Sequence, residues 1–179
     1  MASLSSRVWL MRLVYCGLMI VILFFHLLPL DTVPRHFAPP DLFVAFTFAW
    51  VTRRPDYVPT LLVAAVMLTV DLLLQKPPGL LAAMVVAGCA FLRSRAATPA
   101  SETNFATEWL TVTGVLFAIF AADRAILGLT EIGAPPLLLS VSQLVLTILF
   151  YPLAVVLSQA LFGVRKLKHS DADALGARS

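Results

Sequence analysis

The chain has 179 residues, of which 60% are hydrophobic and 13% are charged, and its mean hydropathy is +0.91. Globular domains carry about 25% charged residues, so this composition excludes a soluble domain and predicts a small all-α integral membrane protein. The net charge is +3. The basic residues lie at the ends of apolar runs and not in a stripe with interleaved aromatic residues, which argues against nucleic acid as a partner.

Six apolar segments follow one another along the chain, at about residues 8–30, 41–52, 57–75, 79–93, 109–129 and 137–162. The first, third, fifth and sixth are near the ~20 residues that a helix needs to cross a bilayer, and we expect them to span it. The first follows Arg7 and Arg12, as in a signal peptide. It is too long for the apolar region of a signal peptide and no small-x-small cleavage site follows it, so we predict an uncleaved span.

The second and fourth segments are short. Their apolar cores, Asp41–Val51 and Gly79–Leu92, reach only about 17 and 21 Å as helices, against ~30 Å of hydrocarbon. Three interpretations stay open: short full spans, tilted re-entrant pieces, or helices shielded by their neighbours.

The basic residues favour six crossings. With a cytoplasmic N-terminus, ten Lys and Arg residues fall inside and two, Arg35 and Lys76, fall outside, whereas four crossings give nine and three. An inside excess is what the positive-inside rule predicts. We therefore predict one multi-pass domain over residues 1–168, cytoplasmic termini, and a disordered polar tail at residues 169–179.

Three proline pairs divide the chain into hairpins. Pro39-Pro40, Pro77-Pro78 and Pro135-Pro136 each stand before an apolar segment, and all three fall on the outer side in the six-span arrangement. Proline fits the first turn of a helix and prevents the preceding chain from continuing as helix. The sequence therefore predicts three helical hairpins, with the KPPG stretch as the tip of the middle one.

Polar side chains recur at a similar depth in the outer half of the predicted spans. They are His26, Asp71, Asp123, Arg124 and Gln143. A charge at the centre of a membrane helix costs ~2.5–3.5 kcal/mol, and neighbours in sequence do not face each other on a helix. We therefore expect Arg124 to contact Asp71. Snorkelling to water, a partner-binding role and a substrate or proton site are the alternatives.

Charged residues of the predicted cytoplasmic loops form a second candidate site. They are Arg53, Arg54, Asp56, Arg93 and Arg95. They suit a docking surface for a cytoplasmic partner, or a topology signal that attracts anionic membrane lipids by ~1 kcal/mol per basic residue. Glu108 and Trp109 are expected at the membrane interface, where tryptophan anchors helices.

Catalytic and metal motifs are missing from the sequence. It has no HExxH, GxSxG or paired-acid motif, so we predict no enzymatic activity. Cys16 and Cys89 have no CxxC or Cys/His neighbourhood, and no second ligand lies near His26 in sequence. We therefore predict no metal site and no cofactor.

The stretches RRPDYVP, DLLLQKPPGLLAA, FLRSR and FATEWL follow one another in this order. Together they resemble the MreD family, over roughly residues 41–129. That family supplies the small membrane subunit of the bacterial rod-shape and cell-wall elongation machinery. The resemblance implies a non-enzymatic scaffold in the bacterial inner membrane. Such a scaffold binds MreC directly and works with MreB, RodA and the penicillin-binding transpeptidase of RodA.

The resemblance also implies a six-helix fold similar to the substrate-binding subunits of energy-coupling-factor vitamin transporters. The alternative function is therefore a transporter substrate subunit with its site in the outer polar layer. The outer loops hold few aromatic or polar groups that would bind a vitamin, and a shared fold does not establish a shared function. An intramembrane lipid enzyme is a third possibility.

Overall fold

The structure, a computed structural model, describes residues 2–28, 38–96, 104–129 and 136–164. These residues are all-helical and contain no strand, as predicted. The elements are α1 (Ala2–Leu27), α2 (Leu42–Arg53), the 3-10 helix η1 (Pro55–Tyr57), α3 (Thr60–Leu73), α4 (Leu80–Ala96), α5 (Phe105–Leu129) and α6 (Leu137–Phe162). The predicted tail at residues 169–179, Arg35 and Pro135 lie outside the described residues.

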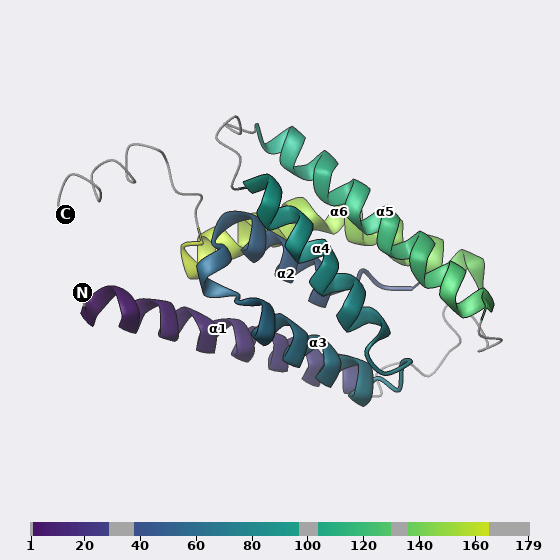
Figure 1. Cartoon of the computed structure of the whole chain (residues 1–179), viewed down its shortest axis with the longest axis horizontal. Coiled ribbons are helices and arrows are strands. Elements are labelled where there is room, and N and C mark those ends of the chain that lie inside the picture. Colours follow the sequence, from purple (N-terminus) through teal and green to yellow (C-terminus); the bar gives the residue numbers. More distant parts are fainter. Residues whose placement is uncertain (1, 29–37, 97–103, 130–135, 165–179) are drawn as a thin grey trace.

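Successive α-helices run in alternating directions along the long axis of the molecule (Figure 1). One end holds η1, the starts of α1 and α5 and the ends of α2, α4 and α6; we call it the η1 end. The opposite end holds Pro40, Pro77 and Pro136, which precede α2, α4 and α6, and we call it the proline end. Pro40, Pro77 and Pro136 therefore precede the helices that they were expected to open.

Helix α2 is the centre of the bundle. Every residue from Phe43 to Val51 is buried, and α2 packs against α1, α4, η1 and, most extensively, α6. The hydroxyl groups of Tyr15 and Thr47 are 2.8 Å apart, and Trp50 Nε1 donates to Ser158 Oγ at 3.1 Å. This short segment is therefore a helix that its neighbours shield, and how far it crosses a membrane stays a prediction.

Within the described residues, three helices are long and apolar enough to cross a membrane: Ser6–Leu27 within α1, Phe105–Leu129 and Leu137–Phe162. The third predicted span, residues 57–75, is wrong in length, because α3 covers only Thr60–Leu73. Pro59 is its N-cap and disfavours helix at Val58. At the other end, Gln75 has a φ of 54°, which ends the helix.

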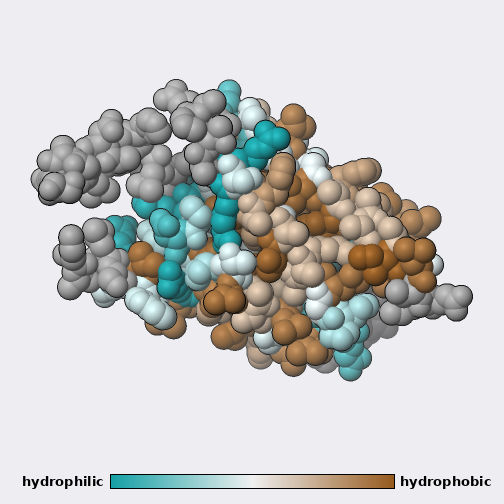
Figure 2. Space-filling view, viewed as in Figure 1, coloured by the Kyte–Doolittle hydropathy of each residue, from teal (hydrophilic) through white to brown (hydrophobic). Residues whose placement is uncertain are grey.

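The surface of the bundle is mainly hydrophobic along its middle. Figure 2 shows a broad hydrophobic band between a hydrophilic region near the η1 end and a smaller hydrophilic patch near the α3–α4 turn. Exposed side chains of α1, α5 and α6, such as Leu13, Phe117 and Leu149, contribute to the hydrophobic surface. Such a surface suits contact with lipid better than contact with water.

A proline within α6 leaves a backbone carbonyl to be satisfied from another helix. Pro152 has no N–H, so the carbonyl of Ile148, four residues earlier, lacks its usual helical donor. Trp109 Nε1 of α5 donates to that carbonyl at 3.1 Å. The indole therefore joins α5 to α6 at the point where the proline interrupts the hydrogen bonds of α6.

Candidate functional site

Asp71 joins α3 to α4. Its side chain is fully buried, and its Oδ2 accepts the backbone N–H groups of Gly79 at 3.1 Å and Ala82 at 3.2 Å. These N–H groups lie at the start of α4, where a helix leaves its donors unpaired. A carboxylate there acts as an N-cap and interacts favourably with the helix dipole. Gly79 has a φ of +83°, a conformation that the turn requires and that glycine adopts without strain.

The expected contact between Asp71 and Arg124 is wrong. Asp71 accepts backbone N–H groups of α4, and Arg124 Nη2 donates to Ser140 Oγ of α6. Their predicted depth in the spans correctly placed Asp71 and Arg124 toward the proline end. Depth alone does not show whether a polar side chain bonds to another side chain or to the backbone. Backbone N–H groups at a helix start carry no sequence signal beyond the preceding Pro-Pro-Gly.

A cavity of about 230 Å³, with both polar and apolar lining, opens at the proline end, between α2, α5, α6 and the α3–α4 turn. Its polar lining comes from Asp41, Lys76, Asp123, Ser140, Gln143 and Thr147, and its apolar lining includes Leu116 and Phe120. Two of the five predicted outer polar residues, Asp123 and Gln143, therefore meet in one cavity. A third, Arg124, contacts its Ser140 wall.

The other two predicted residues do not line the cavity. His26 is exposed near the end of α1, with its ring 6.0 Å from that of Phe43. Asp71 lies in the α3–α4 hairpin, where it serves as the cap described above. The depth predicted from the sequence thus placed these polar groups at the correct end of the molecule, but fewer of them share one site than we expected.

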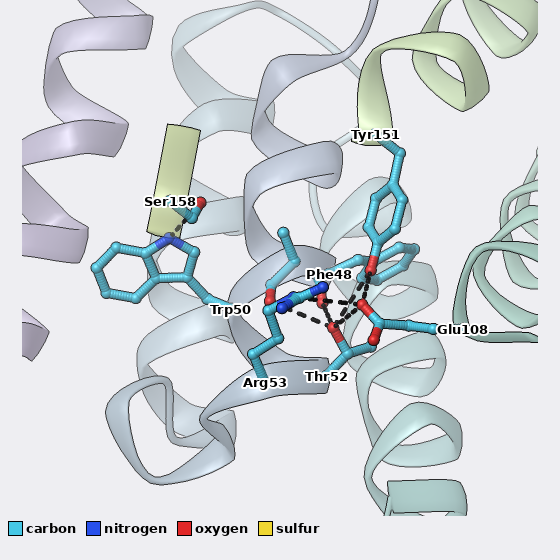
Figure 3. A network of polar contacts seen from close by, with 8 residues as sticks. Phe48, Trp50, Thr52, Arg53, Glu108, Tyr151 and Ser158 are labelled. Atoms are coloured by element: carbon cyan, nitrogen blue, oxygen red, sulfur yellow. Dashed lines mark hydrogen bonds and ion pairs between the residues drawn. The ribbon is translucent and has the colours of Figure 1, made fainter. Parts of the chain in front are cut away.

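A buried polar cluster lies nearer the η1 end and joins α2, α5 and α6 (Figure 3). Arg53 Nε lies 3.5 Å from Glu108 Oε1, and the two side chains are only 9% and 7% exposed. Tyr151 donates its hydroxyl to the same Glu108 oxygen at 3.0 Å. Thr52 lies 3.5 Å from that oxygen and 3.3 Å from the Tyr151 hydroxyl. We refer to these four residues as the Glu108 cluster.

The Glu108 cluster adds to one sequence-based expectation and changes another. Glu108 was expected at the membrane interface; the structure buries its side chain within the bundle, where Arg53 neutralises it and Tyr151 hydrogen bonds to it. Arg53 was a candidate for docking a cytoplasmic partner, yet its guanidinium faces Glu108 inside the bundle. The signal that could have found this pair is the opposite charge of Arg53 and Glu108 at the same predicted depth.

The other four docking candidates differ in whether their side chains contact other residues of the chain or are exposed. Arg93 donates to the Thr60 hydroxyl and the Val58 carbonyl, which fastens the end of α4 to the start of α3. Arg54 lies over the ring of Tyr57. Asp56 is exposed, and its backbone carbonyl accepts from Arg12 at 3.2 Å. Arg95 is exposed and lies over Phe91.

A long apolar groove runs between α4 and α5, with a volume of about 580 Å³. Small residues line much of it: Ala87 and Gly88 on α4, and Gly114, Ala118 and Ala122 on α5. The three α5 residues recur every four positions, so they lie on one helix face. Phe91 and Arg95 line the part of the groove nearest the η1 end. We refer to this feature as the α4–α5 groove.

Two glycines of the α4–α5 groove have different surroundings. A Cβ atom at Gly88 would lie 2.9 Å from Val115 Cγ1 and 3.0 Å from Phe48 Cζ, so Gly88 permits close packing of α4 on α5 and α2. A Cβ atom at Gly114 would meet nothing within 4 Å. Gly88 therefore serves the inside of the bundle, whereas Gly114 faces open space in the groove.

In the described parts of the chain, no group of three His, Cys, Asp or Glu side chains is arranged to hold a metal ion. No protein-family model, no curated protein and no solved structure matches this chain. The cavity, the Glu108 cluster and the α4–α5 groove are therefore the features from which a function can be inferred.

Proposed function

We propose that this protein is a non-enzymatic membrane scaffold of the MreD type, which binds the transmembrane helix of an MreC-like partner in the α4–α5 groove. The observation that carries the proposal is the line of small residues in that groove. Helices associate in lipid mainly through close packing, and Gly and Ala allow two backbones to approach. A single-span protein offers one such helix.

The position of the groove supports the same function. Exposed apolar side chains such as Phe91 and Leu110 lie on the two helices that border it, so a partner would reach it through lipid. Arg95 lies toward the η1 end, where it suits an acidic or polar group next to the partner's helix. The sequence stretches that resemble MreD include both FLRSR, which ends α4, and FATEWL, which begins α5.

We also propose that all six α-helices cross or enter the bacterial inner membrane, as three hairpins with cytoplasmic termini. The alternating helix directions support this arrangement. The shorter helices α2 and α3, of 12 and 14 residues, extend about 18 and 21 Å. Burial of α2 by its neighbours removes the need for it to match the bilayer thickness.

Gly114→Leu tests the groove without disturbing the bundle, because its new side chain would extend into open space. Gly17→Leu on α1 is the matched control, since a Cβ there also meets nothing within 4 Å. Both replace a helical glycine, which favours the helix by up to ~1 kcal/mol. We expect Gly114→Leu to lower co-purification of an MreC-like protein from the host membrane at least tenfold and Gly17→Leu to leave it unchanged.

Depletion in the host tests the cellular role. We expect cells that lose this protein to round up and to lose insertion of new wall along their length. The wild-type chain and Gly17→Leu should restore rods, whereas Gly114→Leu should not. Normal rods after depletion would exclude a role in elongation, and equal partner recovery with both leucine variants would exclude the groove as the binding site.

The polar cavity at the proline end favours one alternative, a substrate-binding subunit of a vitamin-type transporter. Such subunits need an enclosed polar site toward the outer side, and Asp123 and Gln143 supply free polar groups there. Uptake of labelled vitamins by host cells, with and without the protein, tests it. A loss of uptake on depletion, with normal cell shape, would favour the transporter function over the scaffold.

A further inference from the structure

The cavity at the proline end has the composition of a site for a small charged group next to an apolar body. Its volume is about 230 Å³, and it is bordered on one side by Leu116, Ile119 and Phe120 of α5. On the other sides it meets the start of α2, the α3–α4 turn and α6. Polar and apolar side chains share this lining, and Asp123 lies on the same helix as the three apolar residues, so the cavity suits an amphiphile.

Two polar side chains of the cavity have no hydrogen bond to other described residues: the Asp123 carboxylate and the Gln143 amide. Other polar groups of the lining are engaged. Thr147 accepts the Asp41 N–H at 2.8 Å and donates to the Gln143 carbonyl. The Asp123 carboxylate on α5 interacts electrostatically with Lys76 and Arg124 but keeps its hydrogen-bond acceptors for a ligand. The Gln143 amide on α6 can both accept and donate.

Lys76 adds a positive charge at the rim. Its Nζ lies 3.9 Å from Asp41 Oδ2, outside hydrogen-bonding distance, and its side chain is 37% exposed. Asp41 Oδ1 already accepts the Val44 N–H as the N-cap of α2. A ligand anion can therefore approach Lys76 while the ammonium keeps its loose contact with Asp41.

We propose that this cavity binds a primary ammonium joined to a phosphodiester, the chemistry of a phosphoethanolamine lipid headgroup. The ammonium has three N–H donors, which suit the Asp123 carboxylate and the Gln143 amide oxygen. The phosphate lies toward Lys76, and the apolar part follows Leu116 and Phe120. A quaternary ammonium cannot donate hydrogen bonds, and a glycerol headgroup carries no positive charge, so both bind more weakly.

Native mass spectrometry of the full chain in detergent, with added lipid, tests the site. We expect palmitoyl-oleoyl phosphatidylethanolamine to bind at least tenfold more tightly than the phosphatidylcholine or phosphatidylglycerol of the same chains. Soluble glycerophosphoethanolamine forms a separate arm. Weak competition by it identifies the lipid as the source of the headgroup, whereas equal affinity identifies a free zwitterion and favours the transporter alternative.

Asp123→Asn should remove the ethanolamine preference, and Gln143→Leu should weaken it. The control is Asp56→Asn, which changes an exposed aspartate at the η1 end and should leave binding as in the wild type. Thermal unfolding in the same detergent shows that each variant is folded. An unchanged preference in folded Asp123→Asn, or equal binding of the three lipids to the wild type, would overturn the proposal.

Discussion

The hydrogen bond from Trp109 of α5 to α6 beside Pro152 leads to a prediction about the stability of the protein. Trp109→Phe keeps an aromatic ring but removes the donor to the Ile148 carbonyl. Since Pro152 supplies no N–H, that carbonyl then has no partner in the helix. Leaving a fully buried polar group unpaired costs ~1–3 kcal/mol. This hydrogen bond is half-buried, so we expect a loss in the lower part of that range, in addition to the loss of packing from the smaller ring.

Pro152→Ala separates the hydrogen bond from the packing. It restores an N–H four residues after Ile148, so the carbonyl regains a helical donor and no longer needs the indole. In this background Trp109→Phe should cost about 1–2 kcal/mol less than in the wild type, because only the packing loss remains. The predicted coupling exceeds the ~0.3–0.5 kcal/mol scatter of independent sites.

The free energy of unfolding is measured by reversible SDS titration in mixed micelles, followed by helical circular dichroism, for the wild type, both single variants and the double variant. Trp50→Phe is the matched control, because its indole donates to Ser158 and not to Ile148. Trp50→Phe and Pro152→Ala should be additive. Additivity of Trp109→Phe with Pro152→Ala as well would refute the assigned role of the indole.

Three further predictions use the same measurement. Asp71→Ala should lower the free energy of unfolding by about 2–4 kcal/mol, because it removes a cap and leaves two N–H groups of α4 without their acceptor; an effect below 0.5 kcal/mol would contradict the capping role. Gly88→Ala should cost ~1–3 kcal/mol by overpacking against Val115 and Phe48, whereas Gly114→Ala should be neutral or slightly stabilising. Equal effects of the two substitutions would contradict the finding that only Gly114 has room for a Cβ atom. Arg53→Met should cost ~3–5 kcal/mol because it removes the cation that lies 3.5 Å from the buried Glu108 carboxylate. Adding Glu108→Leu should recover much of that loss, and no recovery would mean that Arg53 contributes something other than the ion pair.

Helix positions could be predicted from the sequence because their signals are local. The apolar runs and the proline pairs between them located the six α-helices of the described residues. Pro39-Pro40, Pro77-Pro78 and Pro136 precede the helices that they were expected to open. The length of α3 was overestimated because hydropathy continues through Tyr57 and Val58. Backbone restriction by Pro59 overrides hydropathy there.

The partners of the polar groups could not be predicted in the same way. Asp71 accepts backbone N–H groups at the start of α4. Every residue except proline carries such a group, so no residue type in the sequence marks the partners of Asp71. Arg53 and Glu108 have opposite charges at one depth, but 54 residues and two helices separate them along the chain. Tertiary packing, which brings α2, α5 and α6 together, decides that these two form the pair.

The two ends of the bundle differ in what their polar groups leave available. Toward the η1 end, Arg53 faces Glu108, Arg93 binds Thr60 and Val58, and Arg12 binds the Asp56 carbonyl, so charged side chains fasten helices to one another. These contacts hold α4 and α5, the two walls of the α4–α5 groove, in place without a partner. A helix that docks there meets a surface that needs little ordering, which reduces the entropic cost of binding.

Toward the proline end, the cavity keeps Asp123 and Gln143 open to a ligand. Under the proposed function, one protein could bind a helix in the α4–α5 groove and a lipid in the cavity at the same time, because the linings of the two features share only Ile119 of α5.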